Sequence, residues 1–188
     1  MHIGEKVNMY LVSAYFDEES DRIIRRHIER VADKTGNSFM LDNAVPPHMT
    51  ISSLEARSAD VLIPAFESLA HKITAGKTQV VSMGQMLPYV FYLTPLLNEY
   101  LTEVSETVFE AFADIPDVTV NKFYRPGSWL PHITIAKTLT KEQMRTAFEV
   151  MQNGFALFDA GIVRLGLSKV NPHEDVRSME LYDLISIS

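Results

Sequence analysis

Hydrophobic and polar residues follow two different periods along the chain, and these predict a succession of strands and helices. Residues 7–16 alternate and are rich in β-branched and aromatic side chains, which is typical of a strand. Residues 17–35 instead place Ile24, Ile28 and Val31 on one helical stripe, after an acidic start and before Gly36. A strand followed by an amphipathic helix is therefore expected at the beginning of the chain.

The same criteria predict the remaining elements. Strands are expected at residues 48–54, 78–87, 89–93, 118–123, 132–138, 162–170 and 178–186. Helices are expected at 63–73 and at 140–153, the second with a capping box from Thr140 to Gln143. Thr94 and Pro95 are the residue types of an N-cap and a first helical position, so another helix is predicted from Thr94. Its buried face is expected to consist of Leu97, Leu101, Val104, Val108 and Phe112.

The order of these elements repeats. Tyr10 lies within a strand, and a helix and then a proline-preceded strand that begins at His48 follow it. Tyr92, a helix and a proline-preceded strand that begins at His132 stand in the same order. Two copies of a strand–helix–strand unit predict an α+β molecule with pseudo-twofold symmetry, whereas chance alternation of elements is the alternative. The length of 188 residues fits one domain, or two small lobes that share a core, over residues 1–188.

The two proline-preceded strands carry the residues most suggestive of chemistry. They read PHMTI at residues 47–51 and PHITI at residues 131–135. Side chains alternate between the faces of a strand, so His48 shares a face with Thr50 and His132 shares one with Thr134. One His-x-Thr sequence is weak evidence, but two of them in equivalent places of a repeat predict that both pairs face one central groove.

The two His-x-Thr-hydrophobic motifs, and the stretch YRPGSWLPHITIA at residues 124–136, resemble the two-histidine phosphoesterase superfamily. Within it, the 2′-5′ RNA ligase and RNA cyclic phosphodiesterase group looks most similar. The element order extends this resemblance over nearly the whole chain. The resemblance implies a bilobal α+β fold in which antiparallel sheets line a central groove and helices lie outside. It also implies metal-independent chemistry on cyclic or 2′-5′ phosphodiesters, without a cofactor.

Two histidines can divide the acid and base roles at one phosphorus atom, because imidazole titrates near neutral pH. His48 and His132 are the candidate catalytic residues, and the sequence leaves open which one is the acid. Thr50 and Thr134 are expected to donate hydrogen bonds to the non-bridging phosphate oxygens. In the reverse direction, the same groups would join a cyclic phosphate to a 5′-hydroxyl and act as a ligase.

Other candidate residues have weaker support. Tyr124 could stack on a base and Arg125 could pair with a phosphate, and both are therefore candidate substrate-binding residues, although an ordinary loop role is the alternative. Trp129, the only tryptophan, is expected to pack the loop. Four histidines without a partner motif are expected at the surface: His2, His27, His71 and His173.

Composition and charge restrict the classes of ligand and partner that the chain is expected to bind. The formal net charge is −7 and the basic residues are scattered, so a nucleotide or a single RNA end is expected and an extended nucleic-acid surface is not. No signal peptide or membrane span is expected. The absence of cysteine excludes disulfides, thiol nucleophiles and cysteine-ligated zinc, and it fits a cytoplasmic location. No metal-ligand spacing, glycine-rich phosphate loop or serine-hydrolase motif is found, so no metal is expected.

Two other classes of function remain open. A non-catalytic module could hold a nucleotide or RNA end in the same groove, and a structural domain could carry the histidine–threonine pairs at strand edges. The sequence does not decide the natural substrate, the direction of the reaction or the oligomeric state.

Overall fold

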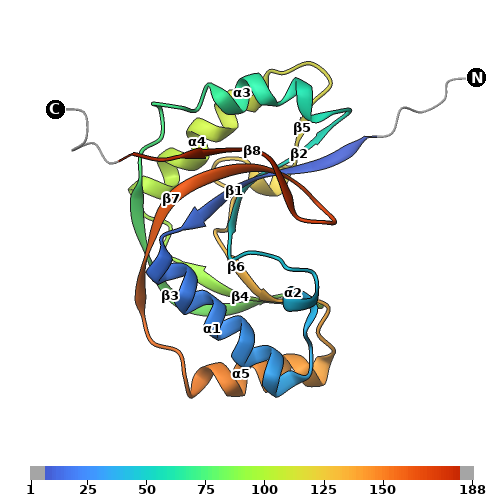
Figure 1. Ribbon diagram of the computed structural model, residues 1–188, viewed down its shortest axis with the longest axis vertical. Helices are drawn as coiled ribbons and strands as arrows, with labels where there is room; N and C mark the ends of the chain where they lie inside the picture. Colours follow the sequence, from blue (N-terminus) through green and yellow to red (C-terminus); the bar gives the residue numbers. More distant parts are fainter. Residues whose placement is uncertain (1–6, 183–188) are drawn as a thin grey trace, which may run out of the picture.

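The computed structural model describes residues 7–182, and its strands form one sheet in which every pairing is antiparallel (Figure 1). The strands are β1 (Asn8–Phe16), β2 (Met49–Ala56), β3 (Gly76–Met86), β4 (Val90–Pro95), β5 (Thr119–Val120), β6 (Ile133–Ala136), β7 (Phe158–Lys169) and β8 (Glu174–Glu180). They follow the order β1-β2-β6-β4-β3-β7-β8, with β5 beside β2. Because β1 also pairs with β7, the strands from β1 to β7 in this order close into a ring.

Helices cover this ring of strands at two ends. They are α1 (Glu18–Thr35), α2 (Phe39–Asp42), α3 (Ile63–Glu67), α4 (Glu99–Ala113) and α5 (Lys141–Gln152), with 3₁₀ turns η1 (Ala59–Val61) and η2 (Lys122–Tyr124). In Figure 1, α3 and α4 lie at one end of the molecule and α1 and α5 at the other. The expected α+β fold with antiparallel strands inside and helices outside is confirmed. Within residues 7–182, no helix combines the length and apolarity needed to cross a membrane.

The pairing pattern has the symmetry that the repeated element order predicts. Exchanging β1 with β4, β2 with β6 and β3 with β7 converts every pairing of the ring into one that exists, for example β1–β2 into β4–β6. α1 packs against α5 and α3 against α4, so each helix pair takes one helix from each half of the chain. The single pairing of β2 with β6, Met49 with Ile133, lies on the symmetry axis.

One detail of the repeat differs from the expectation. Tyr92 pairs with Thr134 across β4 and β6, whereas the residue that pairs with Thr50 across β1 and β2 is Ser13. Ser13 therefore corresponds to Tyr92, and Tyr10 lies nearer the start of β1, in the hydrophobic core. The two halves consequently present different side chains beside their motifs.

α1 and α5 begin where the sequence signals place them. The Asp17 side chain accepts the backbone N–H of Ser20 at 2.8 Å and caps α1. The predicted capping box between Thr140 and Gln143 caps α5. Nε2 of Gln143 also donates to the carbonyl oxygen of Thr35 at 3.1 Å, which ties the start of α5 to the end of α1.

The helix predicted from Thr94 begins later than expected. Its N-cap is Asn98, whose side chain accepts the backbone N–H of Leu101 at 3.0 Å, while Thr94 and Pro95 belong to β4. Pairing of this segment with β3 overrides the local Thr-Pro signal. The predicted apolar face of α4 is buried except for Leu97, which precedes the helix and is 49% exposed.

Other predicted ranges also change. The helix expected at 63–73 ends at residue 67, because the backbone N–H groups of Leu69, Ala70 and Lys72 bond three residues back in tight turns. The strand expected at 118–123 shortens to β5 and continues into η2. The strand expected at 178–186 is β8, at 174–180, and residues 183–186 lie outside the described residues. The short helix α2 has no counterpart among the predicted elements.

Candidate active site

The same backbone contact fixes both motif histidines. Nδ1 of His48 lies 2.8 Å from the carbonyl oxygen of Pro46, and Nδ1 of His132 lies 2.9 Å from that of Leu130. Because a carbonyl oxygen only accepts hydrogen bonds, each Nδ1 carries a hydrogen and donates it. Nε2 of each neutral ring keeps its lone pair and has no hydrogen-bond partner among residues 7–182. Each histidine therefore offers Nε2 for proton transfer.

The central pairing of β2 with β6 brings the two motifs side by side in one sheet. Extending its register by one residue in each direction sets His48 opposite Thr134 and Thr50 opposite His132. The two histidines then stand diagonally across the strand pair, where residues on one face are roughly 7–8 Å apart. A single phosphate group fits between two imidazoles in such an arrangement.

A cavity of about 330 Å³ lies beside this strand pair. His48, Thr50 and Thr134 line it, together with Lys137 and His173. None of its lining residues is Asp or Glu, although the whole chain carries a formal net charge of −7. Within residues 7–182, neither threonine hydroxyl has a hydrogen-bond partner. The cavity thus suits an anionic ligand.

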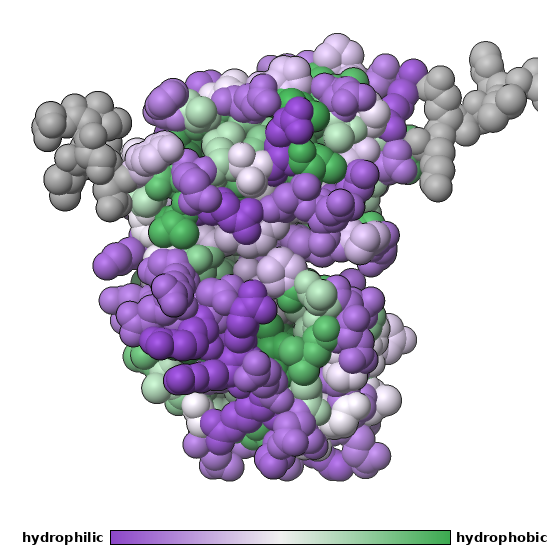
Figure 2. All heavy atoms as spheres, viewed as in Figure 1, coloured by the Kyte–Doolittle hydropathy of each residue, from purple (hydrophilic) through white to green (hydrophobic). Residues whose placement is uncertain are grey.

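α2 supplies an apolar wall to this cavity through Phe39 and Met40. Nζ of Lys137 lies 5.8 Å from the centroid of the Phe39 ring, so a cation and a flat apolar surface stand together. Figure 2 shows hydrophobic side chains gathered beside a notch in the surface, where Figure 1 places α2. The cavity can therefore hold a ligand with both an anionic and an apolar part.

A second, mostly apolar hollow of about 300 Å³ is lined by His132, Tyr124 and Trp129. Nε1 of the buried Trp129 donates to the carbonyl oxygen of Thr50 at 3.0 Å, which ties the loop before the second motif to the strand of the first. Trp129 thus packs the loop as expected. Burial raises the pKa of the Tyr124 hydroxyl. The structure therefore brings the predicted binding residue Tyr124 to the site as a neutral ring.

Arg125 lies apart from both cavities. It lines a separate hollow with Glu110 and Asp114. The structure does not bring it to the motif histidines, and its pairing with a substrate phosphate stays a prediction. Lys137, which follows the second motif and was not singled out in the sequence, is a cation that lines the cavity of His48.

The expectation of surface positions is wrong for His27, and it misses that the partly exposed His173 lines the cavity of His48. His27 lies on the buried face of α1, with its ring centroid 6.1 Å from that of Phe155, because its helical position faces the core. His173 lies beside His48. His71 is exposed as expected, and His2 lies outside the described residues. Within residues 7–182, no three histidine, aspartate or glutamate side chains are grouped so as to hold a metal ion.

His173 packs its ring against that of His48, with centroids 4.4 Å apart and planes inclined by 35°. It belongs to the turn between β7 and β8, and its Nε2 lies 2.8 Å from the hydroxyl oxygen of Tyr15. The Tyr15 hydroxyl has one hydrogen, which it donates to Asp175 at 2.6 Å. Nε2 of His173 must therefore be the donor toward Tyr15.

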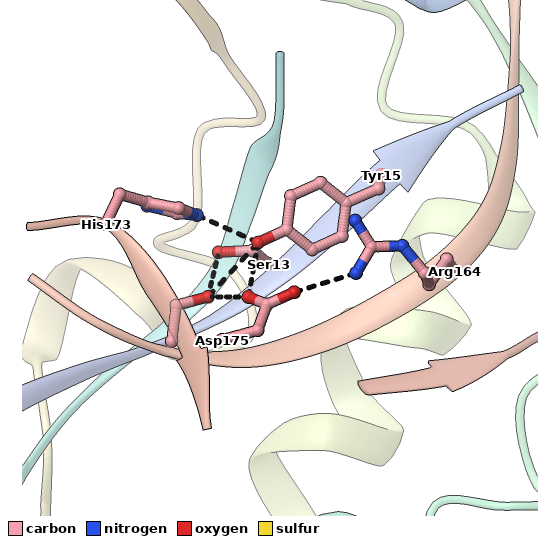
Figure 3. A network of polar contacts seen from close by, with 6 residues as sticks. Ser13, Tyr15, Arg164, His173 and Asp175 are labelled. Atoms are coloured by element: carbon pink, nitrogen blue, oxygen red, sulfur yellow. Dashed lines mark hydrogen bonds and ion pairs between the residues drawn. The ribbon is translucent and has the colours of Figure 1, made fainter. Parts of the chain in front are cut away.

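Asp175 is the centre of the polar network behind His173 (Figure 3). Its carboxylate accepts hydrogen bonds from Tyr15, from Ser168 at 2.7 Å and from Arg164 at 2.7 Å. Burial alone would raise the pKa of Asp175, but these bonds and the Arg164 charge outweigh it and lower the pKa. A Cβ atom at Gly166 would stand 2.5 Å from the Asp175 carboxylate, so glycine is required for this close approach.

Burial makes the three imidazoles of the site harder to protonate. For His48, burial and then the charge of a protonated His173 lower the pKa to about 4. Burial lowers the pKa of His132 although its bond to Leu130 works in the opposite direction. Burial also lowers the pKa of His173, against the Asp175 charge. The unliganded site therefore holds neutral imidazoles near pH 7, and an anionic phosphate would favour the proton that one of them needs as an acid.

Comparison with known sequences decides the family. A family model described as the 2′-5′ RNA ligase superfamily matches residues 19–173, which contain both motifs. The chain belongs to the 2′-5′ RNA ligase superfamily. A comparison of this superfamily member with curated proteins finds no match.

Solved structures agree with this assignment at the level of the fold. E. coli LigT complexed with 3′-AMP matches with a TM-score of 0.59 and 14% identity over 95% of this chain and 100% of that chain. The apo form of E. coli LigT matches with a TM-score of 0.54 and 16% identity over 95% and 99%. Kluyveromyces marxianus Usb1 matches with a TM-score of 0.46 and 8% identity over 96% and 100%. The LigT matches show that this superfamily member shares the LigT fold.

Proposed function

We propose that the chain is a metal-independent phosphodiesterase that acts on 2′,3′-cyclic or 2′-5′ phosphodiesters of nucleotides or RNA ends. His48 and His132 are the proposed acid and base. The observation that supports this most strongly is the matched pair of motifs on β2 and β6, each with Nδ1 held by a carbonyl oxygen and Nε2 left open. Membership of the superfamily supports a phosphoesterase or ligase class of enzyme.

Hydrolysis of a 2′,3′-cyclic phosphate would need two proton transfers, one at each histidine ring. Neutral His48 takes a proton from water through Nε2 while the water oxygen bonds to phosphorus. Protonated His132 gives its proton to a ribose oxygen while the bond from that oxygen to phosphorus breaks. Each transfer contributes on the order of 10²–10⁴-fold. When a 5′-hydroxyl takes the place of water, the same two transfers form a bond from its oxygen to phosphorus while the bond from phosphorus to the 3′ oxygen breaks, which leaves a 2′-5′ linkage.

We assign the base to His48 because of its neighbours. A second imidazole 4.4 Å away disfavours a positive charge on His48. His132 instead meets the Tyr92 ring edge-on, with centroids 5.6 Å apart. His132 is therefore the better residue to hold a proton once an anionic phosphate is bound.

The threonines and the two cavities supply binding. Thr50 and Thr134 would donate hydroxyl hydrogen bonds to the non-bridging oxygens, where the transition state carries charge. The cavity beside His48 would take the anionic and apolar parts of a nucleotide, and Tyr124 beside His132 would stack on a base. The 3′-AMP bound to the LigT neighbour supports a nucleotide ligand for this fold.

The test is a panel of substrates incubated in EDTA. It contains 2′,3′-cyclic mononucleotides, an RNA with a 2′,3′-cyclic end, and dinucleotides with 2′-5′ and 3′-5′ linkages. We expect turnover of the cyclic or 2′-5′ substrates, with losses of at least about 10²-fold in His48→Gln and His132→Gln. The control His71→Asn removes an exposed histidine that lines neither cavity.

Two results would overturn the proposal. Turnover that persists in a folded double variant of His48 and His132 would remove these residues from the mechanism. Binding of 3′-AMP or 2′-AMP without turnover of any substrate would instead identify a nucleotide-binding module that uses the same groove.

A further inference from the structure

His173 occupies a place that neither motif explains. Its ring packs on the face of His48, while the carbonyl oxygen of Pro46 holds the edge of the same His48 ring at Nδ1. Together these contacts fix both the plane and the rotation of His48. Nε2 of His173 is committed to Tyr15, and its Nδ1 has no hydrogen-bond partner among residues 7–182. His173 can therefore take up a proton at Nδ1 without losing its bond to Tyr15.

Two imidazoles at this separation titrate as a pair. Like charges 4.4 Å apart repel, so the pair takes up one proton well before it takes up a second. The question is then which ring receives the first proton, and the charged groups around the pair decide it.

The charges around the pair favour His173 as the first site. On its side stands the Asp175 carboxylate, linked to it through the Tyr15 hydroxyl, whose charge favours a proton on His173. Arg164 is bound to the far oxygen of that carboxylate, and its charge opposes this proton less strongly than the carboxylate favours it. His48 is the more enclosed ring and faces His132, and Lys137 lines the same cavity. A proton on His132 would disfavour a positive charge on His48.

We propose that His173 is a positioning residue of this site: tied to Asp175 through Tyr15, it takes the first proton of the stacked pair and so keeps His48 neutral. This inference deepens the proposed function and rests on it, because a neutral His48 matters if His48 is the base. The charge of His173 is the second largest influence that lowers the pKa of His48, after burial. His173 also holds the His48 ring toward the groove.

The polar network behind His173 holds its ring in one orientation. The Tyr15 hydroxyl cannot lose its proton easily, because burial and the neighbouring Asp175 raise its pKa. The Arg164 guanidinium packs over the Tyr15 ring, 3.8 Å from its centroid. Gly166 leaves the space in which Tyr15 and Asp175 approach β7. The orientation of His173 is thus set by groups that do not themselves enter the cavity.

The experiment compares two variants with matched controls. His173→Phe keeps a flat ring against His48 and removes the charge, and Tyr15→Phe cuts the link to Asp175. Their controls are His71→Asn and Tyr100→Phe, which lies outside both cavities and whose hydroxyl donates to the carbonyl oxygen of Thr74 at 2.9 Å. The measurements are an NMR titration of the His48 ring and the pH dependence of kcat/KM on a 2′,3′-cyclic nucleotide.

In His173→Phe, the apparent pKa of His48 should rise by roughly one unit. A base with a higher pKa is lost at higher pH, so the acid limb of kcat/KM should move upward by the same amount, with little change above pH 8. Tyr15→Phe should shift the pKa of His48 and the acid limb of kcat/KM in the same direction but by less. The two control variants should leave both quantities unchanged. His173→Gln provides the same comparison if His173→Phe does not fold.

An unchanged His48 titration in a folded His173→Phe variant would overturn the proposal. A rise in KM alone, with the same pH profile, would also overturn it and make His173 a ligand contact. The NMR titration does not need turnover, so it tests His173 even if the substrate panel gives no activity. Failure of the proposed function and failure of this inference are thereby told apart.

Discussion

His48 and His132 carry the same backbone hydrogen bond, and yet their surroundings differ. His48 stacks on another imidazole, while His132 meets the edge of Tyr92. Environments that push the proton affinities of two like groups apart are a usual way in which one site obtains both an acid and a base. The proposed division of roles therefore rests on the neighbours of each motif and not on the motifs themselves.

A substrate with an activated leaving group should separate the two roles. On a nucleotide 4-nitrophenyl phosphodiester, the leaving nitrophenolate needs no proton, so His132→Ala should stay within about tenfold of the wild-type rate. His48→Ala should lose at least about 10²-fold on the same substrate and on a cyclic nucleotide. The measurement is kcat/KM on both substrates, and the opposite pattern of losses would reverse the assignment of acid and base.

The buried His48 should also make stability depend on pH. An unfolded histidine takes up its proton near pH 6.5, whereas the folded-state pKa of His48 is about 4. Between these values the unfolded chain binds the extra proton, so the free energy of unfolding falls as the pH is lowered through this window. His48→Gln should lose less stability than the wild type between pH 7.5 and 4.5, as measured by urea unfolding.

The control for this measurement is His71→Asn, which changes an exposed histidine. It should show the same loss of stability as the wild type over the same pH range. An equal loss in all three proteins would mean that His48 is not the group responsible.

The sequence predicts the motif residues but not the third histidine. His48, Thr50, His132 and Thr134 stand out because they recur in equivalent places of a repeat. His173 lies in the turn before β8 and Asp175 within that strand, so no strand alternation in the sequence pairs them. Nothing local indicates that Tyr15 meets them, because pairing of β1 with β7 brings them together.

Among the elements, α5 is tied to the end of α1 by one side chain. Gln143 contributes to both the capping box of α5 and its link to α1. Gln143→Ala should therefore lower the free energy of unfolding by about 1–2 kcal/mol, because it removes two hydrogen bonds at a helix end. Gln152→Ala, at an exposed position of the same helix, should change it by less than about 0.5 kcal/mol.

Chemical unfolding of the two variants checks this prediction. A Gln143→Ala variant as stable as Gln152→Ala would show that the tie between α5 and α1 contributes nothing measurable. Loss of activity without loss of stability would place Gln143 in the groove instead.

Local signals were sufficient for elements whose ends are set by their own side chains. The caps of α1 and α5 belong to this class. The start of α4 does not, because β4 continues through Thr94 to pair with β3. The short α2 has too few residues to show a period, and its existence matters because it forms the apolar wall of the cavity.

At the scale of the whole molecule, the net charge predicts that short substrates suffice. The chain carries a formal net charge of −7, and the cations near the groove are few. A long RNA gains affinity mainly through phosphate contacts with basic residues. Lengthening an RNA with a 2′,3′-cyclic end from two to about twelve nucleotides should therefore change kcat/KM by less than about threefold.

The measurement is a length series at two salt concentrations. A steady rise of kcat/KM with length, which salt abolishes, would reveal an extended binding surface. The exposed arginines of α1, such as Arg22 and Arg26, would then be the first residues to replace.

The repeated order of elements was enough to predict the symmetric topology, since each half contributes strands in the same sequence. It could not give the register, which decides that Ser13 and not Tyr10 corresponds to Tyr92. Register depends on bulges such as the one between Val12 and Ser13, and no residue pattern marks it. The asymmetry between the two motifs was therefore visible only in three dimensions.

The closed ring of strands makes the stability of each half of the chain depend on the other half. β1 finds its outer partner in β7, and β4 finds its own in β3, so neither half completes its hydrogen bonds alone. Unfolding one half strips backbone partners from the other and pulls apart the strand pair that carries both histidines. We therefore expect the molecule to unfold in one cooperative transition, without a half-folded form that retains the site.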